Sequence, residues 1–107
     1  MNDEPWYSAR CLFRHIGLPA EPGMAVYEER IVLFRADSFE NATRKAEDEA
    51  REYTSEEIEY LGFVELFHLF EPVVGDGSEV FSLMRTSALG SEDYITRFLD
   101  TGSERSR

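Results

Sequence analysis

The segment of residues 60–70 constrains the fold most, because its sequence predicts a strand that is apolar on both faces. Successive side chains of a strand point to opposite sides of a sheet. A strand with one side in water alternates apolar and polar residues, and this segment does not. It therefore requires cover on both sides. One side would carry Leu61, Phe63, Glu65, Phe67 and Leu69, and the other would carry Tyr60, Val64, Leu66, His68 and Phe70.

Two earlier segments predict an antiparallel pair of strands. Residues 6–15 have an apolar face at their odd positions and a mixed face at their even positions. Residues 27–36 are apolar at their centre. Between them, residues 17–23 hold two prolines and two glycines, which interrupt regular structure. The two segments are therefore expected to form a hairpin with a longer loop.

Residues 38–53 predict the one long helix. Either Asp37 or Ser38 can cap its first turn, and Glu40 sits where a capping box anchored on Asp37 requires it. An inward stripe recurs at helical spacing, and its small alanines would let the helix lie close to a sheet. The stripe consists of Phe39, Ala42, Thr43, Ala46, Ala50 and Tyr53.

The remainder of the chain predicts a second hairpin and a short helix. Pro72 and the sequence of residues 75–77 indicate a turn after the central strand, and residues 79–85 read as its hairpin partner. Residues 91–99 begin with a serine and two acids, which favour a helix start. The order is strand–strand–helix–strand–strand–helix. We therefore expect an α+β fold, an antiparallel sheet of about four strands with the long helix on one face.

The composition is that of one acidic globular domain over residues 1–107, with residues 1–5 and 101–107 expected to be disordered. The net charge of −11 disfavours nucleic acid and anionic membranes as partners. The chain has no long uncharged apolar run and no signal-peptide pattern, so we expect a cytoplasmic protein without a membrane span. The single cysteine, Cys11, cannot form an internal disulfide, which agrees with a reducing compartment.

Neither a metal site nor a catalytic site is predicted. Cys11 and His15 lie four residues apart on one strand, about 13 Å at strand rise, which is too far for one zinc ion. His68 would add one ligand without a defined partner. A buried thiol at Cys11 would be inert. No serine lies in a Gly-x-Ser-x-Gly turn, and no glycine-rich loop joins a strand to a helix, so no cofactor is predicted.

The charged residues within the strands are the stronger candidates for binding. Glu65 interrupts an apolar face, and we expect a strand arginine to pair with it. An arginine and aromatic sheet face suits a carboxylate, a phosphate or a protein partner, whereas cross-strand ion pairs are the alternative explanation. The candidate ligand- or partner-binding residues are Trp6, Arg10, Arg14, Glu65, His68 and Arg85.

Three segments together carry a family resemblance. They are residues 6–10, residues 28–36 followed by Ser38 and an alanine-rich helix, and residues 77–82. The chain resembles a family of small bacterial proteins known as domain of unknown function 4288. The resemblance covers most of residues 6–87. It implies a bacterial cytoplasmic protein and implies no catalytic residues.

These observations lead to three functional hypotheses. The first is a non-enzymatic binding module that forms a homodimer through the second face of its sheet, because one long helix covers only one face. The second is a small-ligand protein or cofactor-free enzyme with a pocket between sheet and helix. The third is an acidic regulator whose carboxylates, concentrated in residues 47–59, dock on a basic protein. The pocket of the second hypothesis would use His68, Glu65, Tyr7, His15 and Arg85.

Overall fold

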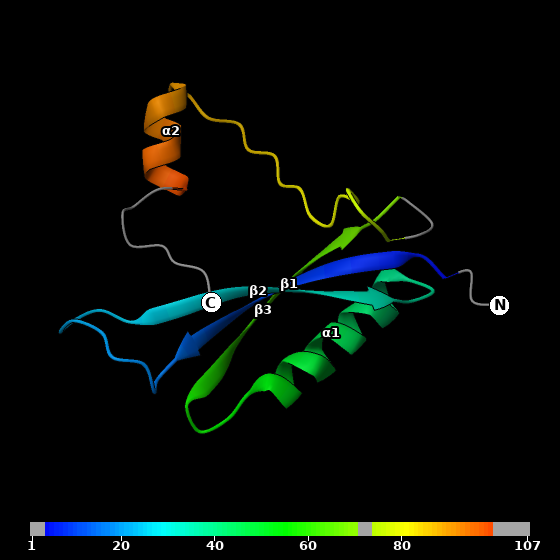
Figure 1. The fold of residues 1–107 in the computed structure, drawn as a ribbon, viewed down its shortest axis with the longest axis horizontal. Helices are drawn as coiled ribbons and strands as arrows, with labels where there is room; N and C mark the ends of the chain where they lie inside the picture. The colour runs from blue at the N-terminus through cyan, green and yellow to red at the C-terminus, as the bar shows by residue number, and fades with distance from the viewer. Residues whose placement is uncertain (1–3, 71–73, 100–107) are drawn as a thin grey trace.

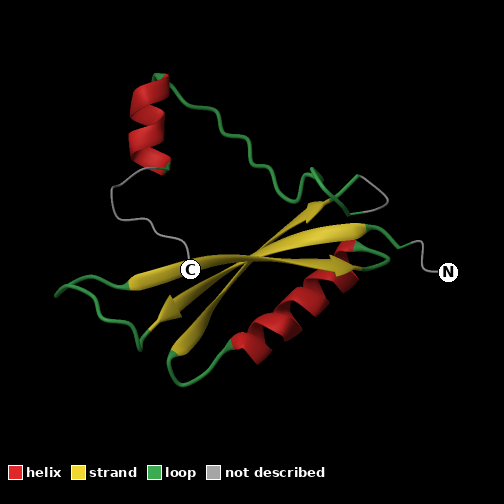
Figure 2. Ribbon diagram, viewed as in Figure 1, coloured by secondary structure: helices red, strands yellow, loops and turns green. Residues whose placement is uncertain are grey.

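A computed structural model describes residues 4–70 and 74–99 of the chain. It has an α+β fold in which a three-stranded antiparallel sheet carries one long helix on one face (Figures 1 and 2). Regular structure comes in the order β1 (Trp6–His15), β2 (Val26–Arg35), α1 (Phe39–Tyr53), β3 (Ile58–His68) and α2 (Ser91–Phe98). Neither helix in the described ranges has the length and apolar character that a membrane crossing requires.

The first strand is the centre of the sheet, with the order β2-β1-β3. The predicted hairpin is confirmed, because β1 pairs antiparallel with β2 from Trp6 opposite Arg35 to His15 opposite Val26. The strand predicted over residues 60–70 is β3, which also pairs antiparallel with β1. It therefore lies at an edge of the sheet, where its ladder has one partner strand.

The core lies between the sheet and α1. The N-cap of α1 is Ser38, whose Oγ accepts a hydrogen bond from the Asn41 amide at 3.1 Å, so of the two predicted caps Ser38 is the one used. The alanine stripe of α1 is buried, with Ala42, Ala46 and Ala50 at most 1% exposed. Small side chains let the helix axis approach the strands closely. The odd positions of β1 form the facing layer, as predicted, and they are Tyr7, Ala9, Cys11 and Phe13.

A bulge in β3 sets which of its side chains face α1. Cys11 pairs with Val64 and Phe13 pairs with Tyr60, so four residue steps on β3 match two on β1. Gly62 lies inside this bulge with φ of +80°, a conformation that glycine adopts at little cost. Because the insertion is an even number of residues, the alternation of faces is the same before and after it. Tyr60 and Val64 both pack on the core.

The predicted fourth strand is wrong. Residues 79–85 form no ladder, although the preceding turn is present, with the Ser78 amide donating to the Gly75 carbonyl at 3.0 Å. Instead this stretch crosses the sheet face opposite α1, where the Phe81 ring lies 6.3 Å from the Phe67 ring. An aromatic side chain placed over a bare apolar face buries surface that pairing along the outer edge of β3 would leave exposed.

The predicted chain ends lie partly outside the described residues. Residues 1–3 and 100–107, and Pro72 within residues 71–73, are not described. Pro5 is described, and its carbonyl accepts a hydrogen bond from the Ala36 amide at 3.2 Å. The N-terminal strand is therefore tied to the end of β2 from its first residues.

The second helix stands clear of the sheet. It contacts none of the other described helices and strands, and Figure 1 shows it on the side of the sheet opposite α1. The radius of gyration of 16.3 Å exceeds the value of about 13 Å that is typical of a chain of this length. We name residues 74–99, which end in α2, the arm.

Candidate functional site

The candidate site is the sheet face opposite α1, which we name the open face. Side-chain alternation and register place three strands' residues on it. They are Trp6, Ser8, Arg10, Leu12 and Arg14 of β1, Tyr27, Glu29, Ile31, Leu33 and Arg35 of β2, and Glu59, Phe63, Glu65 and Phe67 of β3.

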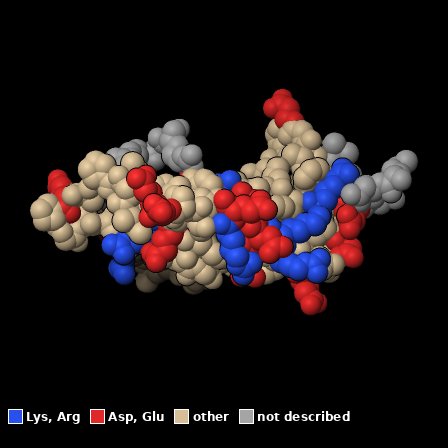
Figure 3. Space-filling model, turned by 90° about the horizontal axis from the view of Figure 1, so that it is seen from below, with Lys and Arg blue, Asp and Glu red and all other residues tan. Residues whose placement is uncertain are grey.

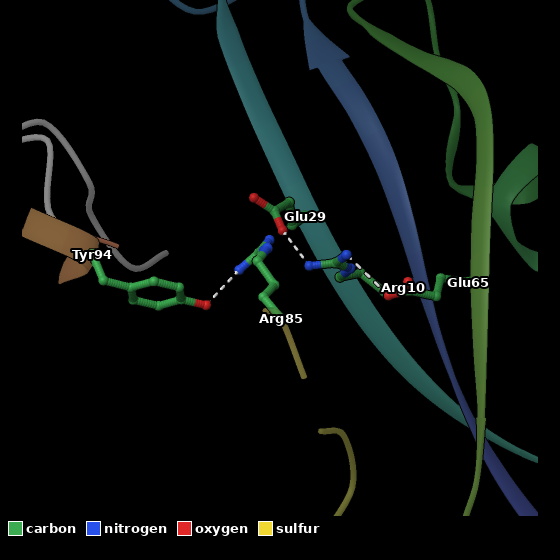
Figure 4. Close-up of polar contacts among 5 residues, drawn as sticks. All are labelled: Arg10, Glu29, Glu65, Arg85 and Tyr94. Carbon is green, nitrogen blue, oxygen red and sulfur yellow. Dashed lines mark hydrogen bonds and ion pairs between the residues drawn. The ribbon is translucent and has the colours of Figure 1, made fainter. Parts of the chain in front are cut away.

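Arg10 lies at the centre of the open face and pairs with a carboxylate on each side. Its guanidinium is 2.9 Å from Glu29 of β2 and 2.9 Å from Glu65 of β3 (Figure 4). This confirms the predicted pairing of Glu65 with a strand arginine. The side chain of Arg10 is only 18% exposed. Partial burial strengthens such charge-assisted contacts, so the cluster pins the register of all three strands.

Two aromatic rings complete the surroundings of Arg10. The guanidinium carbon lies 5.0 Å from the centre of the Phe81 ring and 5.9 Å from that of Phe63. Cations over aromatic faces at this range are attracted by the ring quadrupole. Both terminal nitrogens of Arg10 have a carboxylate partner, so the geometry favours cross-strand pairing over capture of a free anion.

The end of the open face at Trp6 is covered. Arg35 lies over the Trp6 ring at 4.7 Å, and Ser8 is fully buried. The Ser8 hydroxyl has no hydrogen-bond partner among the described residues. Its burial without a partner costs free energy, since water would otherwise satisfy it. This end of the open face is thus closed at an energetic cost.

The other end of the open face is exposed. Tyr27 is 60% exposed, Ile31 is 43% exposed and Phe63 is 44% exposed. Arg14 belongs to the same end, is exposed, and has no hydrogen bond or ion pair within the described ranges. Apolar side chains of the two outer strands and one unpaired guanidinium of β1 are therefore accessible on the open face.

Two of the predicted binding residues are not among the strand residues of the open face. His68 points to the α1 side because it alternates with Phe67, and its ring lies 5.1 Å from the Tyr7 ring. Arg85 lies in the arm, where its guanidinium donates to the Tyr94 hydroxyl at 3.3 Å (Figure 4). The guanidinium also lies over the Phe98 ring. The other four, Trp6, Arg10, Arg14 and Glu65, share the open face.

A polar cluster that the sequence pattern does not predict joins β1, β2 and α1 on the opposite side. His15 Nε2 lies 2.8 Å from Glu28 Oε1, and the Tyr53 hydroxyl donates to the same oxygen at 2.8 Å. Arg30 pairs with Glu49 at 2.6 Å and stacks 3.9 Å over the Tyr53 ring. The pairing of His15 with Glu28 follows from the hairpin register, which no local pattern reveals. The cluster holds the C-terminal end of α1 against the sheet.

The single thiol lies in the core. Cys11 is 6% exposed, and burial raises its pKa above the ordinary value, which disfavours the reactive thiolate. Burial also raises the pKa of Tyr60 to about 12, with the neighbouring Cys11 adding to the shift. Within residues 4–70 and 74–99, no three His, Cys, Asp or Glu side chains gather in a way that could hold a metal ion.

A shallow cavity of about 340 Å³ lies in the arm, between residues 85–91 and α2. Of the five residues proposed for a pocket between sheet and helix, only Arg85 lines it. The surface on the α1 side shows Lys and Arg next to Asp and Glu (Figure 3). Acidic and basic groups are therefore interspersed there, although the chain as a whole is acidic.

No curated protein and no solved structure matches this chain. A family model does match it, over residues 6–82. The matched part includes β1, β2, α1, β3 and Phe81, and it ends before Arg85 and α2. Since the match covers more than half of the chain, the protein belongs to the family described as domain of unknown function DUF4288.

Proposed function

We propose that the protein is a non-enzymatic interaction module that self-associates through the exposed end of its open face. The observation that carries this proposal is the exposure of three large apolar side chains on the open face, Tyr27 and Ile31 of β2 and Phe63 of β3. Exposed clusters of large apolar side chains on a folded domain mark interaction sites.

The positions of the two segments that cover the sheet, α1 and the stretch around Phe81, support this proposal. α1 lies on the other face of the sheet, and Phe81 of the arm reaches only as far as Arg10 and Phe67. The strands continue beyond this point through Leu12 and Arg14. A second copy can supply the missing cover, because a two-fold axis brings identical patches together.

The state of the polar groups supports a binding role over a catalytic one. Arg10 has two carboxylate partners, and His15 is paired with Glu28. These groups serve the contacts between strands. The exposed end offers apolar area and charge complementarity, which are the properties of a protein interface.

Light scattering and sedimentation of the purified chain test the proposal. We expect a mass of twice 12.4 kDa at micromolar concentration. The variant Ile31→Asp places a carboxylate in the interface and should raise the dimer dissociation constant at least about tenfold.

Leu18→Asp is the matched control. Leu18 is 44% exposed against 43% for Ile31, but it lies in the loop between β1 and β2. The substitution Leu18→Asp should leave the dimer dissociation constant unchanged. A wild-type chain that stays at 12.4 kDa up to high micromolar concentration would refute self-association.

A further inference from the structure

The strongest unexplained feature outside the open face is α2. Its residues Ile95 and Phe98, and Leu99 after it, are 48%, 40% and 60% exposed. The helix contacts no other helix or strand of the described chain. An eight-residue helix without tertiary contacts is marginal in water, so its apolar stripe requires a partner.

Contacts within the arm hold α2 in this position. Arg85 donates to the Tyr94 hydroxyl and lies 4.7 Å over the Phe98 ring. These contacts fix the start and the end of α2 to the preceding extended segment. Ile95 and Leu99 of α2 and the exposed end of the open face thus both remain accessible in the same chain.

We infer that two copies exchange their α2 helices, so that α2 of each copy packs on the exposed end of the open face of the other, while Phe81 of each copy stays on its own sheet. This inference rests on the proposed self-association and names the segment that makes it. The occupant of the face is a second copy of this chain. Its residues Ile95, Phe98 and Leu99 lie against Ile31 and Phe63 of the partner.

Charge complementarity fits this arrangement. The first turn of α2 carries Glu92 and Asp93, and its last turn carries Arg97. On the open face Arg14 has no described partner, and Glu29, one row along, is 64% exposed although its Oε1 already accepts from Arg10. Asp93 and Arg97 are about 6 Å apart along the helix, and the rows of Arg14 and Glu29 are about 7 Å apart along the strand. Asp93 can therefore meet Arg14 while Arg97 meets Glu29.

The two-fold symmetry halves the area that each contact has to bury. An exchange uses the same contact twice, so each α2 contact has to bury about 600 Å² to reach the roughly 1,200 Å² at which stable interfaces begin. A single α2 docked on one sheet would reach half of this. The closed exchange also leaves no uncovered open face on either copy.

Cross-linking of full-length single-cysteine additions tests the exchange. One chain carries Ile31→Cys and the other carries Leu99→Cys, while the buried Cys11 remains in both as background. The two chains are mixed and treated with a short thiol cross-linker. We expect a covalent dimer in the mixture, and only the wild-type background in either variant alone.

A chain that carries both substitutions separates the outcomes. A covalent dimer of this double variant supports the exchange, and a cross-link confined to the monomer overturns it, because α2 then covers its own sheet. A non-covalent wild-type dimer without any cross-link in the mixture overturns the exchange and leaves self-association intact. A monomeric wild-type chain overturns the proposed function itself.

Charge reversal gives a second, independent measurement on the folded chain. Arg14→Glu and Asp93→Arg should each weaken the dimer about two- to fivefold, and the chain with both should recover wild-type affinity. The control is a chain with Arg14→Glu and Asp48→Arg, because Asp48 is an exposed aspartate on α1. This control chain should not recover the wild-type dimer affinity. Equal affinities for both double variants would overturn the pairing of α2 with the open face.

Discussion

Ser8 and Ser38 show how one residue type acts in opposite directions in this fold. Ser8 is 0% exposed and its hydroxyl lacks a described partner, whereas Ser38 caps α1. Ser8→Ala should therefore raise the free energy of unfolding by about 1 kcal/mol, and Ser38→Ala should lower it by about 1 kcal/mol. Urea unfolding followed by circular dichroism measures both. A loss of stability in Ser8→Ala would show that its hydroxyl has a bonding partner.

Tyr60 predicts how stability changes in alkaline solution. Its pKa is raised from 10.0 to about 12, so the unfolded chain loses this proton before the folded chain does. The raised pKa of Tyr60 therefore adds to the free energy of unfolding. This added stability is complete below pH 10 and is lost as the pH rises from 10 to 12. Between pH 9 and pH 11 we expect the wild type to lose more unfolding free energy than Tyr60→Phe. Equal losses in the two proteins would contradict the raised pKa.

At the scale of the element, Gly62 is the residue on which the bulge of β3 depends. Its φ of +80° favours glycine, while the space around it is open, so only backbone strain opposes a side chain. Gly62→Ala should lower the free energy of unfolding by about 1 kcal/mol. Gly75→Ala is the control, since Gly75 has open space and an ordinary φ. It should change stability by much less in the same urea titration.

The two helices differ in what stabilises them. α1 has a capping serine, three buried alanines and the Arg30–Glu49 pair to the sheet. α2 has a glycine at its N-cap without a side-chain cap, and no buried residue. Short helices depend on tertiary packing, which α1 has within the described chain and α2 lacks. This difference is the basis of the proposed exchange.

At the scale of the whole molecule, the chain builds one covered and one half-covered sheet face. The helix supplies the first cover, and an extended segment around Phe81 supplies half of the second. The proposed self-association and the proposed exchange of α2 both concern the half that remains exposed. The proposed dimer would make the unfolding free energy depend on protein concentration, because association and folding are linked.

Local patterns in the sequence were sufficient to predict much of this fold. The period-two alternation of residues 6–15 identified the buried layer of β1, and the serine before an alanine stripe identified the start of α1. The isolated Glu65 in an apolar strand was sufficient to predict an arginine partner, because a half-buried carboxylate requires one. Each of these depends on neighbours within a few residues or on the chemistry of a single side chain.

Only the tertiary structure decided the strand order, the course of residues 79–85 and the position of α2. β3 joined the free edge of β1, and the segment predicted as a fourth strand crossed the open face instead of extending the ladder. Both outcomes come from competition between distant surfaces for the same apolar cover. A sequence pattern records that a segment needs burial. The surface that provides the burial is set by the whole folded chain.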